Sequence, residues 1–359
     1  MGKPLGVGIV GVGNISTQYL ENIPKLDNLC LIGVSDLNHQ RAADIAEKHK
    51  IRAFNGDEIF QDQDIDVILN LTLPQSHTEV NLKALNAGKH VYLEKPFALS
   101  VNEGASILKL AEKSDLRVGC APDTFLGTGI QTSKSLILDG EIGTPFAAAA
   151  FWGAPGHELW HPSPQFYYQN GAGPLFDMGP YYLTALVVLL GPVTRVVGSS
   201  IRSDRTRKVH SGDLADTPLT VEVDTHISAL LTHASGAQST ITVSFETWGS
   251  RQPNIEVFGT QGTLNVPDPN KFCDSPQIYT ESNREWVTVE ERAGFRESGR
   301  GIGLSEMGTA ISKGVSHRAS GDLGMHVLEI MEAILKTGQS QFVVEINSTV
   351  EEVHLVPLT

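Results

Sequence analysis

The sequence predicts two structural parts, an α/β part followed by an α+β part. Residues 1–122 are expected to form a doubly wound parallel sheet, and residues 123–359 an open, mainly antiparallel sheet with helices on one face. Two observations support this division. The chain has 359 residues, which is more than one hydrophobic core usually serves. Apolar runs alternate with helical segments only in the first part, whereas strand patterns dominate the second.

The first part repeats a strand and then a helix. Short apolar runs bounded by turns suit strands that are buried on both faces of a parallel sheet. The expected strands are Leu5 to Val10, Leu29 to Asp36, Asp66 to Thr72, His90 to Glu94 and Arg117 to Ala121. The expected helices are Asn14 to Lys25, His39 to His49, Ser76 to Ala87 and Val101 to Lys113.

A glycine motif, GVGNIS, joins the first strand to the first helix. Gly11 permits a tight turn, and Gly13 lets the backbone approach a pyrophosphate at a helix N-terminus. Ser16 stands where the usual fingerprint has a third glycine, and Asp36 ends the next strand 20 residues later. This context predicts a Rossmann domain that binds a dinucleotide. The expected contacts here are Gly11, Gly13, Asn14, Ile15 and Asp36.

Asp36 also indicates which dinucleotide is preferred. A carboxylate accepts hydrogen bonds from the adenosine ribose hydroxyls and repels the 2′-phosphate of NADP. Arg41 follows on the next helix and is able to pair with that phosphate if it turns inward. The sequence therefore favours NAD without excluding NADP.

The second part has strands with one polar and one apolar face. In Ile241 to Thr247, isoleucine, valine and phenylalanine alternate with polar residues. The other expected strands are Pro145 to Trp152, Arg195 to Ile201, Leu219 to Leu231, Asn254 to Gly259, Thr263 to Val266 and Glu285 to Glu290. Helices are expected over Phe125 to Asp139 and Gly321 to Lys336, a hairpin turn over Gly259 to Gly262, and an exposed loop over Ser203 to Asp216.

Composition restricts the function classes. The net charge of −14 argues against a nucleic-acid partner, because phosphates attract a basic surface. The apolar stretch from Tyr181 to Leu190 is shorter than the roughly 20 residues of a membrane helix, and no leader pattern precedes the first strand. Three separated cysteines fit a reducing cytoplasm and are expected to be small buried hydrophobes.

Four motifs in this order resemble the glucose–fructose oxidoreductase / inositol dehydrogenase / MocA family over essentially the whole chain. They are GVGNIS with Asp36, TLPQSH at 72–77, EKP at 94–96 and GAGPLFDMGPYY at 171–182. The resemblance implies that Lys95 is catalytic and that the Lys95–Pro96 peptide is cis. A cation at this strand end would stabilise a developing alkoxide. By the same resemblance, the nicotinamide side of the cofactor site includes Thr72, Pro74, His77, Glu94 and Lys95.

The last motif departs from the family pattern at Tyr181, where most members carry a histidine. A tyrosine stands there in the glucose–fructose oxidoreductase and dihydrodiol dehydrogenase branches. The resemblance therefore implies that Tyr181 takes the substrate proton, for which a tyrosine needs a lowered pKa and a nearby cation. Asp177 lies four residues earlier on the same helix face, where it would orient substrate hydroxyls and is a candidate to hold Lys95.

A polar and aromatic cluster precedes this motif. His157, Trp160 and His161 suit a sugar, whose ring stacks on aromatic faces and whose hydroxyls need hydrogen-bond partners. A zinc site built with Glu158 is the alternative, but its spacing matches no usual structural site, and no metal is predicted. The other alternative is a loop that only packs on the domain.

The resulting hypothesis is an NAD-dependent oxidoreductase acting on a secondary alcohol (CH–OH) of a polyol, sugar or sugar derivative. Two alternatives remain open, an NAD-dependent glycosidase of the same fold and a non-catalytic dinucleotide-binding regulator. A small-molecule substrate and a homodimer or homotetramer are expected, with neither a nucleic-acid nor a membrane partner. The spacing of residues gives neither the particular substrate nor the direction of the reaction.

Overall fold

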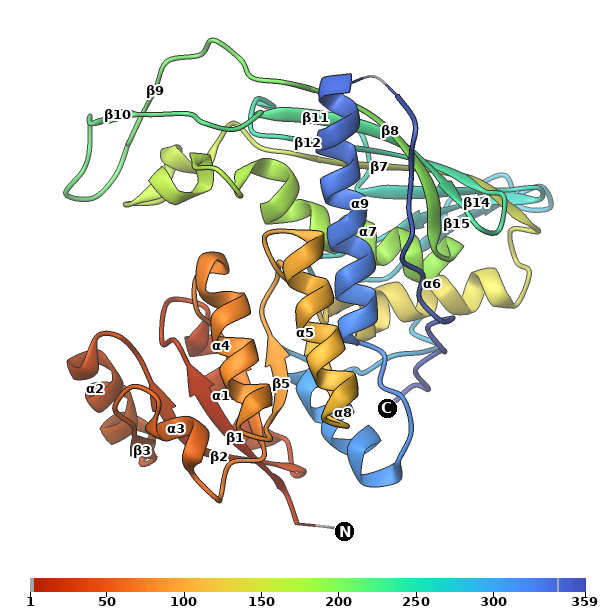
Figure 1. Ribbon diagram of the computed structural model, residues 1–359. Coiled ribbons are helices and arrows are strands. Elements are labelled where there is room, and N and C mark those ends of the chain that lie inside the picture. The colour runs from red at the N-terminus through yellow and green to blue at the C-terminus, as the bar shows by residue number, and fades with distance from the viewer. Residues whose placement is uncertain (1–2, 341) are drawn as a thin grey trace. The chain divides into compact units, whose positions relative to one another are not determined.

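The structure is a computed structural model that describes residues 3–340 and 342–359. It divides into two compact units (Figure 1). The first unit contains residues 1–126 and 297–328, and the second contains residues 127–296 and 329–359. Both predicted fold classes are confirmed, a parallel sheet in the first unit and a largely antiparallel sheet in the second.

The first unit is built on a six-stranded parallel sheet with the order β3-β2-β1-β4-β5-β6. The order reverses beside β1, and ligands of such sheets bind outside the strand ends at that point. The strands are β1 (Leu5–Val10), β2 (Leu29–Ser35), β3 (Arg52–Ala53), β4 (Val67–Asn70), β5 (His90–Leu93) and β6 (Val118–Cys120). Its first helices are α1 (Ser16–Asn22), η1 (Ile23–Lys25), α2 (His39–His49), α3 (Glu58–Gln61), α4 (Pro74–Asn86) and α5 (Val101–Lys113), and η2 (Thr124–Leu126) ends this stretch.

The first unit also includes a late segment of the chain, which the predicted division at residue 122 assigned to the second part. Residues 297–328 contain α8 (Ile302–Lys313) and the start of α9 (Gly321–Ser340). This segment returns to β6, where Cys120 N donates to Ala319 O at 3.0 Å. Asp123 accepts from Gly301 N and Gly303 N at 3.0 and 3.1 Å. These contacts join positions far apart in sequence, so local patterns do not reveal them.

The second unit contains a nine-stranded sheet with the order β16-β15-β14-β13-β7-β12-β11-β8-β17. Among the described strands of this sheet, only β7 and β12 pair in parallel. The strands are β7 (Pro145–Gly153), β8 (Val193–Ile201), β11 (His226–His233), β12 (Gln238–Ser244), β13 (Ile255–Gly259), β14 (Gly262–Val266), β15 (Gln277–Thr280), β16 (Val287–Thr288) and β17 (Val344–Glu345). The predicted hairpin turn between β13 and β14 is confirmed.

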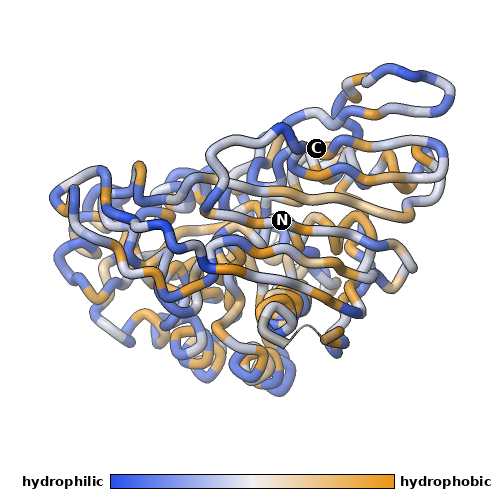
Figure 2. Tube along the Cα trace, turned by 90° about the horizontal axis from the view of Figure 1, so that it is seen from above, coloured by the Kyte–Doolittle hydropathy of each residue, from blue (hydrophilic) through white to orange (hydrophobic). Residues whose placement is uncertain are grey.

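Helices α6 (Thr128–Leu138) and α7 (Gly173–Leu190) lie along one face of this sheet (Figure 1). Apolar strand residues such as Ile241 and Val243 are buried on that face, and polar and apolar segments alternate along the strands (Figure 2). Within the described residues, α7 is the one helix long and apolar enough to cross a membrane, and it is 94% buried inside the protein. The apolar stretch is thus longer than expected, and its burial is that of a core helix.

The segment Ser203 to Asp216 was expected to be an exposed loop, and most of its residues are exposed, but the prediction is wrong at its centre. It contains β9 (Arg207–Lys208), which pairs with β10 (Pro218–Leu219), and the side chains of Arg207 and Val209 are buried. The cause is the pairing of Arg207 with two carboxylates, the buried Glu158 and the partly buried Glu246.

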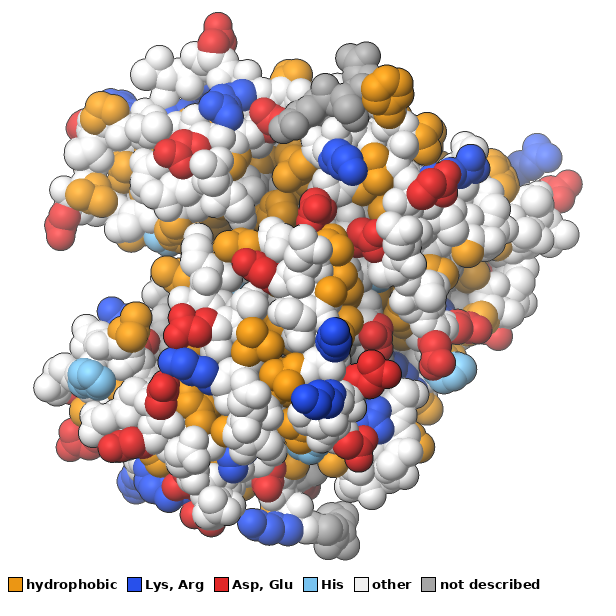
Figure 3. Space-filling model, viewed as in Figure 1, with side chains coloured by type: hydrophobic (Ala, Val, Ile, Leu, Met, Phe, Trp, Pro, Cys, Tyr) orange, Lys and Arg blue, Asp and Glu red, His pale blue; other side chains and the backbone are white. Residues whose placement is uncertain are grey.

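Two smaller expectations also differ. The expected strand Leu219 to Leu231 is interrupted, because β11 begins only at His226. Cys120 is buried as expected, whereas Cys30 and Cys273 are exposed. On the face shown in Figure 3, acidic and basic side chains are interspersed among the described residues.

Candidate active site

The glycine motif forms the turn between β1 and α1. Gly11 has a φ of +92°, and a Cβ atom on it would lie 2.8 Å from Leu71 O, so this position requires glycine. A Cβ atom on Gly13 would meet no atom within 4 Å, so the backbone is open to a ligand there. Ser16 Oγ donates to Gly13 O at 2.7 Å, which closes the turn where the fingerprint has its third glycine.

Asp36 lies at the end of β2 and is tied to this turn. Its Oδ2 accepts from Val12 N and its Oδ1 from Asn38 N, both at 2.8 Å. A carboxylate has about four lone-pair sites, so two backbone bonds leave room for ribose hydroxyls. Arg41 is exposed on α2. Together with the open backbone at Gly13, this arrangement fits a dinucleotide.

The TLPQSH segment joins β4 to α4. His77 is fully buried, with Nδ1 2.7 Å from Pro96 O and Nε2 3.1 Å from Thr72 O. Burial lowers the pKa of His77. Its contacts give His77 the role of joining two turns, whereas Thr72 and Pro74 are half-buried and remain partly accessible.

The EKP segment follows β5, and the Lys95–Pro96 peptide is cis, as the resemblance implied. Lys95 is half-buried. Glu94 is 6% exposed; its Oε2 accepts from Lys95 N at 3.1 Å and its Oε1 from the Tyr19 hydroxyl at 2.8 Å. Burial, followed by the charge of Glu94, raises the pKa of Tyr19, which keeps this phenol protonated as a donor. No sequence motif marks Tyr19, so this contact was not predicted.

In the second unit, α7 carries Asp177 and Tyr181 one turn apart. Tyr181 is 6% exposed. Asp177 Oδ2 lies 2.7 Å from His157 Nε2, so the structure brings together two of the predicted substrate residues. The next residue on the helix, Tyr182, is a core side chain whose hydroxyl accepts from Asn254 Nδ2 at 2.7 Å.

Aromatic rings surround His157. Its ring centroid lies 4.3 Å from that of Tyr167, 4.7 Å from Phe245 and 5.2 Å from Trp160. His161 continues the cluster at 5.3 Å from Trp160, and Trp160 is 59% exposed. The predicted cluster therefore exists, and Phe245 from the end of β12 is the member that the sequence analysis missed.

Metal ligation is a separate question for the His157 segment. Within residues 3–340 and 342–359, no group of three or more His, Cys, Asp or Glu side chains lies close enough to hold a metal ion. His157 and Glu158 have other partners: His157 contacts Asp177, and Glu158 contacts Arg207.

Comparison with known families identifies the class of protein. Residues 5–121 match the oxidoreductase family with an NAD-binding Rossmann fold, and residues 130–265 match the GFO/IDH/MocA C-terminal domain. The chain belongs to the Gfo/Idh/MocA family and is an NAD-binding oxidoreductase.

Several named proteins are similar to it. Myo-inositol 2-dehydrogenase of Thermotoga maritima is 25% identical over 72% of this chain and 74% of its own length. Trans-1,2-dihydrobenzene-1,2-diol dehydrogenase of Danio rerio is 26% identical over 89% of this chain and 96% of its own. The structure of levoglucosan dehydrogenase with NADH and levoglucosan superposes with a TM-score of 0.82, at 20% identity, covering 96% of this chain and 100% of the other. That structure supports the fold.

Proposed function

We propose that the protein oxidises a secondary alcohol of a polyol, sugar or sugar derivative, with NAD preferred over NADP. The observation that carries this proposal is the contact between His157 Nε2 and Asp177 Oδ2, which lie 2.7 Å apart. Asp177 is one helical turn before Tyr181, and aromatic rings surround His157. Carboxylate and imidazole groups bind hydroxyls, and aromatic faces suit the apolar face of a sugar ring. The named relatives that act on inositol and on a dihydrodiol support the same class of substrate.

Each proposed residue has a separate role. Asp177, oriented by His157, accepts a hydrogen bond from a substrate hydroxyl. Tyr181 accepts the proton of the reacting hydroxyl, and Lys95 stabilises the negative charge that develops on that oxygen. NAD, when bound, supplies the acceptor for the hydride that leaves the substrate carbon.

The cofactor side rests on the first unit. Gly11, Gly13, Asn14 and Ile15 would lie along the pyrophosphate, and Asp36 would bind the ribose hydroxyls. Thr72, Pro74, Glu94 and Lys95 would lie toward the nicotinamide. His77, because it is buried between two carbonyl groups, would act by holding these turns in place.

The test is a panel of polyols, aldoses and anhydrosugars assayed for NADH formation with NAD and, separately, with NADP. For the best substrate, a Lys95→Ala variant should bind NADH normally and retain less than about one tenth of wild-type turnover. Lys83→Ala is the matched control, because Lys83 is a lysine of the same unit that lies outside the proposed site and has a side chain 41% exposed. A Lys95→Ala variant that keeps more than about one tenth of wild-type turnover would contradict the proposal. Release of aryl alcohol from aryl glycosides without net NADH would favour the glycosidase alternative.

A further inference from the structure

A long excursion between β8 and β11 lies beside the loop that carries His157. We call residues 202–225 the arm and residues 155–162 the His157 loop. Their contacts follow chain order: Arg205 Nη1 donates to Pro155 O at 2.7 Å, His210 N to Glu158 O at 2.9 Å and Ser211 Oγ to Trp160 O at 3.0 Å, and a Cβ atom on Gly212 would lie 2.6 Å from Pro162 Cβ. The arm therefore supports the loop along its whole length.

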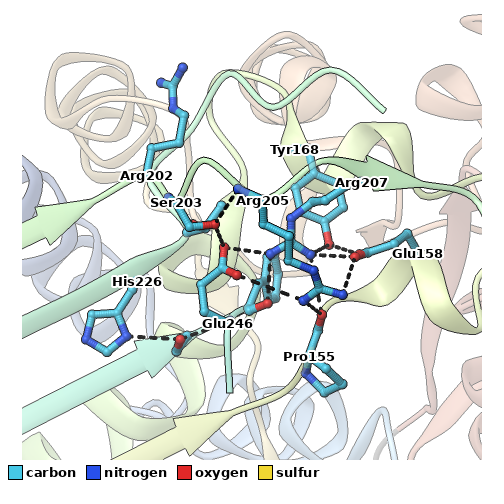
Figure 4. A network of polar contacts seen from close by, with 12 residues as sticks. Pro155, Glu158, Tyr168, Arg202, Ser203, Arg205, Arg207, His226 and Glu246 are labelled. Carbon is cyan, nitrogen blue, oxygen red and sulfur yellow. Dashed lines mark hydrogen bonds and ion pairs between the residues drawn. The ribbon is translucent and has the colours of Figure 1, made fainter. Parts of the chain in front are cut away.

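Arg207 is the buried centre of this contact (Figure 4). Its side chain is 1% exposed, as is that of Glu158, and Nη1 donates to Glu158 Oε1 at 2.5 Å. Nη2 donates to Glu246 Oε1 at 2.6 Å and to Phe245 O at 2.9 Å. One guanidinium group thus holds both the His157 loop and the end of β12, through the fixed fork of donors that arginine provides.

Two routes lead from Arg207 to His157. In the first, Tyr168 donates its hydroxyl hydrogen to Glu158 and accepts from His157 N at 3.2 Å. Burial, and then the hydrogen bond to Glu158, raises the pKa of Tyr168, so the phenol stays protonated. In the second route, Arg207 fixes the backbone of Phe245, whose ring lies 4.7 Å from the His157 ring.

The loop backbone packs tightly against this centre at Gly156. Gly156 has a φ of +111°, and a side chain there would collide with Arg207 and Glu158. Removing the guanidinium would leave Glu158 buried without its closest cation. The position of His157, and with it the hydrogen bond to Asp177, therefore depends on Arg207.

We infer that Arg207 is a positioning residue for the substrate side of the active site, and that the arm determines which hydroxyl-bearing substrate the site accepts. Arg207 touches no reacting atom in this proposal. It acts through Glu158 and Tyr168 on the loop that orients Asp177. The effect on substrate rests on the proposed function of Asp177, whereas the effect on the loop is independent of it.

The experiment compares Arg207→Lys with Arg202→Lys. The Arg207→Lys substitution keeps the positive charge but removes the two guanidinium nitrogens that donate separately to Glu158 and Glu246. Arg202 is a matched control, because among the described residues its exposed guanidinium donates to carbonyls within the arm, those of Val221, Glu222 and Val223. Hydrogen exchange of the backbone amides at 156–161 is measured without substrate. KM and kcat for the best substrate and the Kd of NADH are measured in parallel.

For Arg207→Lys we expect exchange at 156–161 to rise about tenfold or more, because the loop loses part of its support. KM should rise about tenfold, kcat should change by less than about threefold, and the Kd of NADH should stay within about twofold, since a positioning group acts on substrate binding. Arg202→Lys should change none of these. Ser211→Ala, which removes one bond at the far end of the arm, should raise exchange only near Trp160 and His161.

Two results would overturn the inference: unchanged exchange and KM in Arg207→Lys, or equal changes in Arg202→Lys. If no compound of the panel is oxidised, the proposed function fails, but exchange at 156–161 still decides whether Arg207 positions the loop. Raised exchange with an unchanged KM in Arg207→Lys would support the claim that Arg207 positions the loop, but it would overturn the claim that the arm determines which substrate is accepted.

Discussion

Asp36 in the first unit and His157 in the second, both proposed site residues, are held by different means. In the first unit, Asp36 at a strand end is fixed by two backbone amides, those of Val12 and Asn38. In the second unit, His157 is fixed by side chains, and the central bond joins Arg207 to Glu158 across 49 positions of sequence. Backbone partners persist through most substitutions, whereas side-chain partners change with one residue.

This difference bears on how the family's fold serves different substrates. A cofactor site built from strand ends and backbone amides suits a ligand that stays the same. A substrate loop whose position depends on buried charged side chains can be altered without altering the sheet beneath it. Substitutions that disturb one kind of support at a time test this difference.

The largest effect is expected from Arg207→Met, which leaves Glu158 buried beside a neutral side chain. Loss of one partner of a buried pair typically costs about 3–5 kcal/mol of unfolding free energy. All four tryptophans lie in the second unit, so chemical unfolding followed by tryptophan fluorescence reports this loss. Arg202→Met is the control and should change the midpoint little. Equal losses in the two variants would show that the arm, and not the buried pair, carries the stability.

Acid should weaken the first unit through His317, on the late segment that returns to β6. Burial lowers the pKa of His317 to about 4 from its ordinary 6.5, although Nε2 is 3.1 Å from Val118 O. As the pH falls, the unfolded chain therefore binds this proton at a higher pH than the folded chain does. The contribution of neutral His317 to the unfolding free energy is fully present above about pH 6.5, and roughly 3 kcal/mol of it is lost as the pH falls from there through 4. Unfolding followed by far-UV circular dichroism should show a shallower pH dependence in His317→Gln. The exposed His39→Gln should leave that dependence unchanged.

Tyr19→Phe tests the hydrogen bond that holds Glu94 beside Lys95. Loss of a buried bond to a charged group should cost about 2 kcal/mol. The matched control is Tyr182→Phe in the second unit, where the lost partner is the neutral Asn254 amide and about 1 kcal/mol is expected. Unfolding by urea measures both losses. A smaller loss for Tyr19→Phe than for Tyr182→Phe would show that the charge of Glu94 adds nothing there.

The smallest effect concerns cofactor choice. We expect wild-type kcat/KM to be at least about tenfold higher with NAD than with NADP, a difference of about 1.4 kcal/mol. Asp36→Asn removes the charge, keeps one oxygen acceptor, and should reduce this ratio toward one. Equal kcat/KM values with the two cofactors in the wild type, or a preference for NADP that persists in Arg41→Ala, would show that Asp36 does not select the cofactor at its ribose.

The sequence determined much of the first unit. Apolar runs, helix patterns and the glycine motif predicted five of its six strands, because these signals lie within a few residues of each other. Asp36 followed from its position at a strand end, and the EKP segment followed from the resemblance to the family. The same reasoning missed Tyr19, whose role depends on Glu94, 75 positions away.

In the second unit the sequence identified strands, the α7 motif and the His157 cluster, but it did not predict the burial of Arg207 in the arm. Its basic and polar residues are typical of an exposed loop, and only the tertiary structure places Arg207 against two carboxylates. Local sequence patterns also did not predict that residues 297–328 belong to the first unit. Local patterns record which face of an element is apolar, whereas the pairing of a buried charge depends on partners that the fold brings together from distant positions.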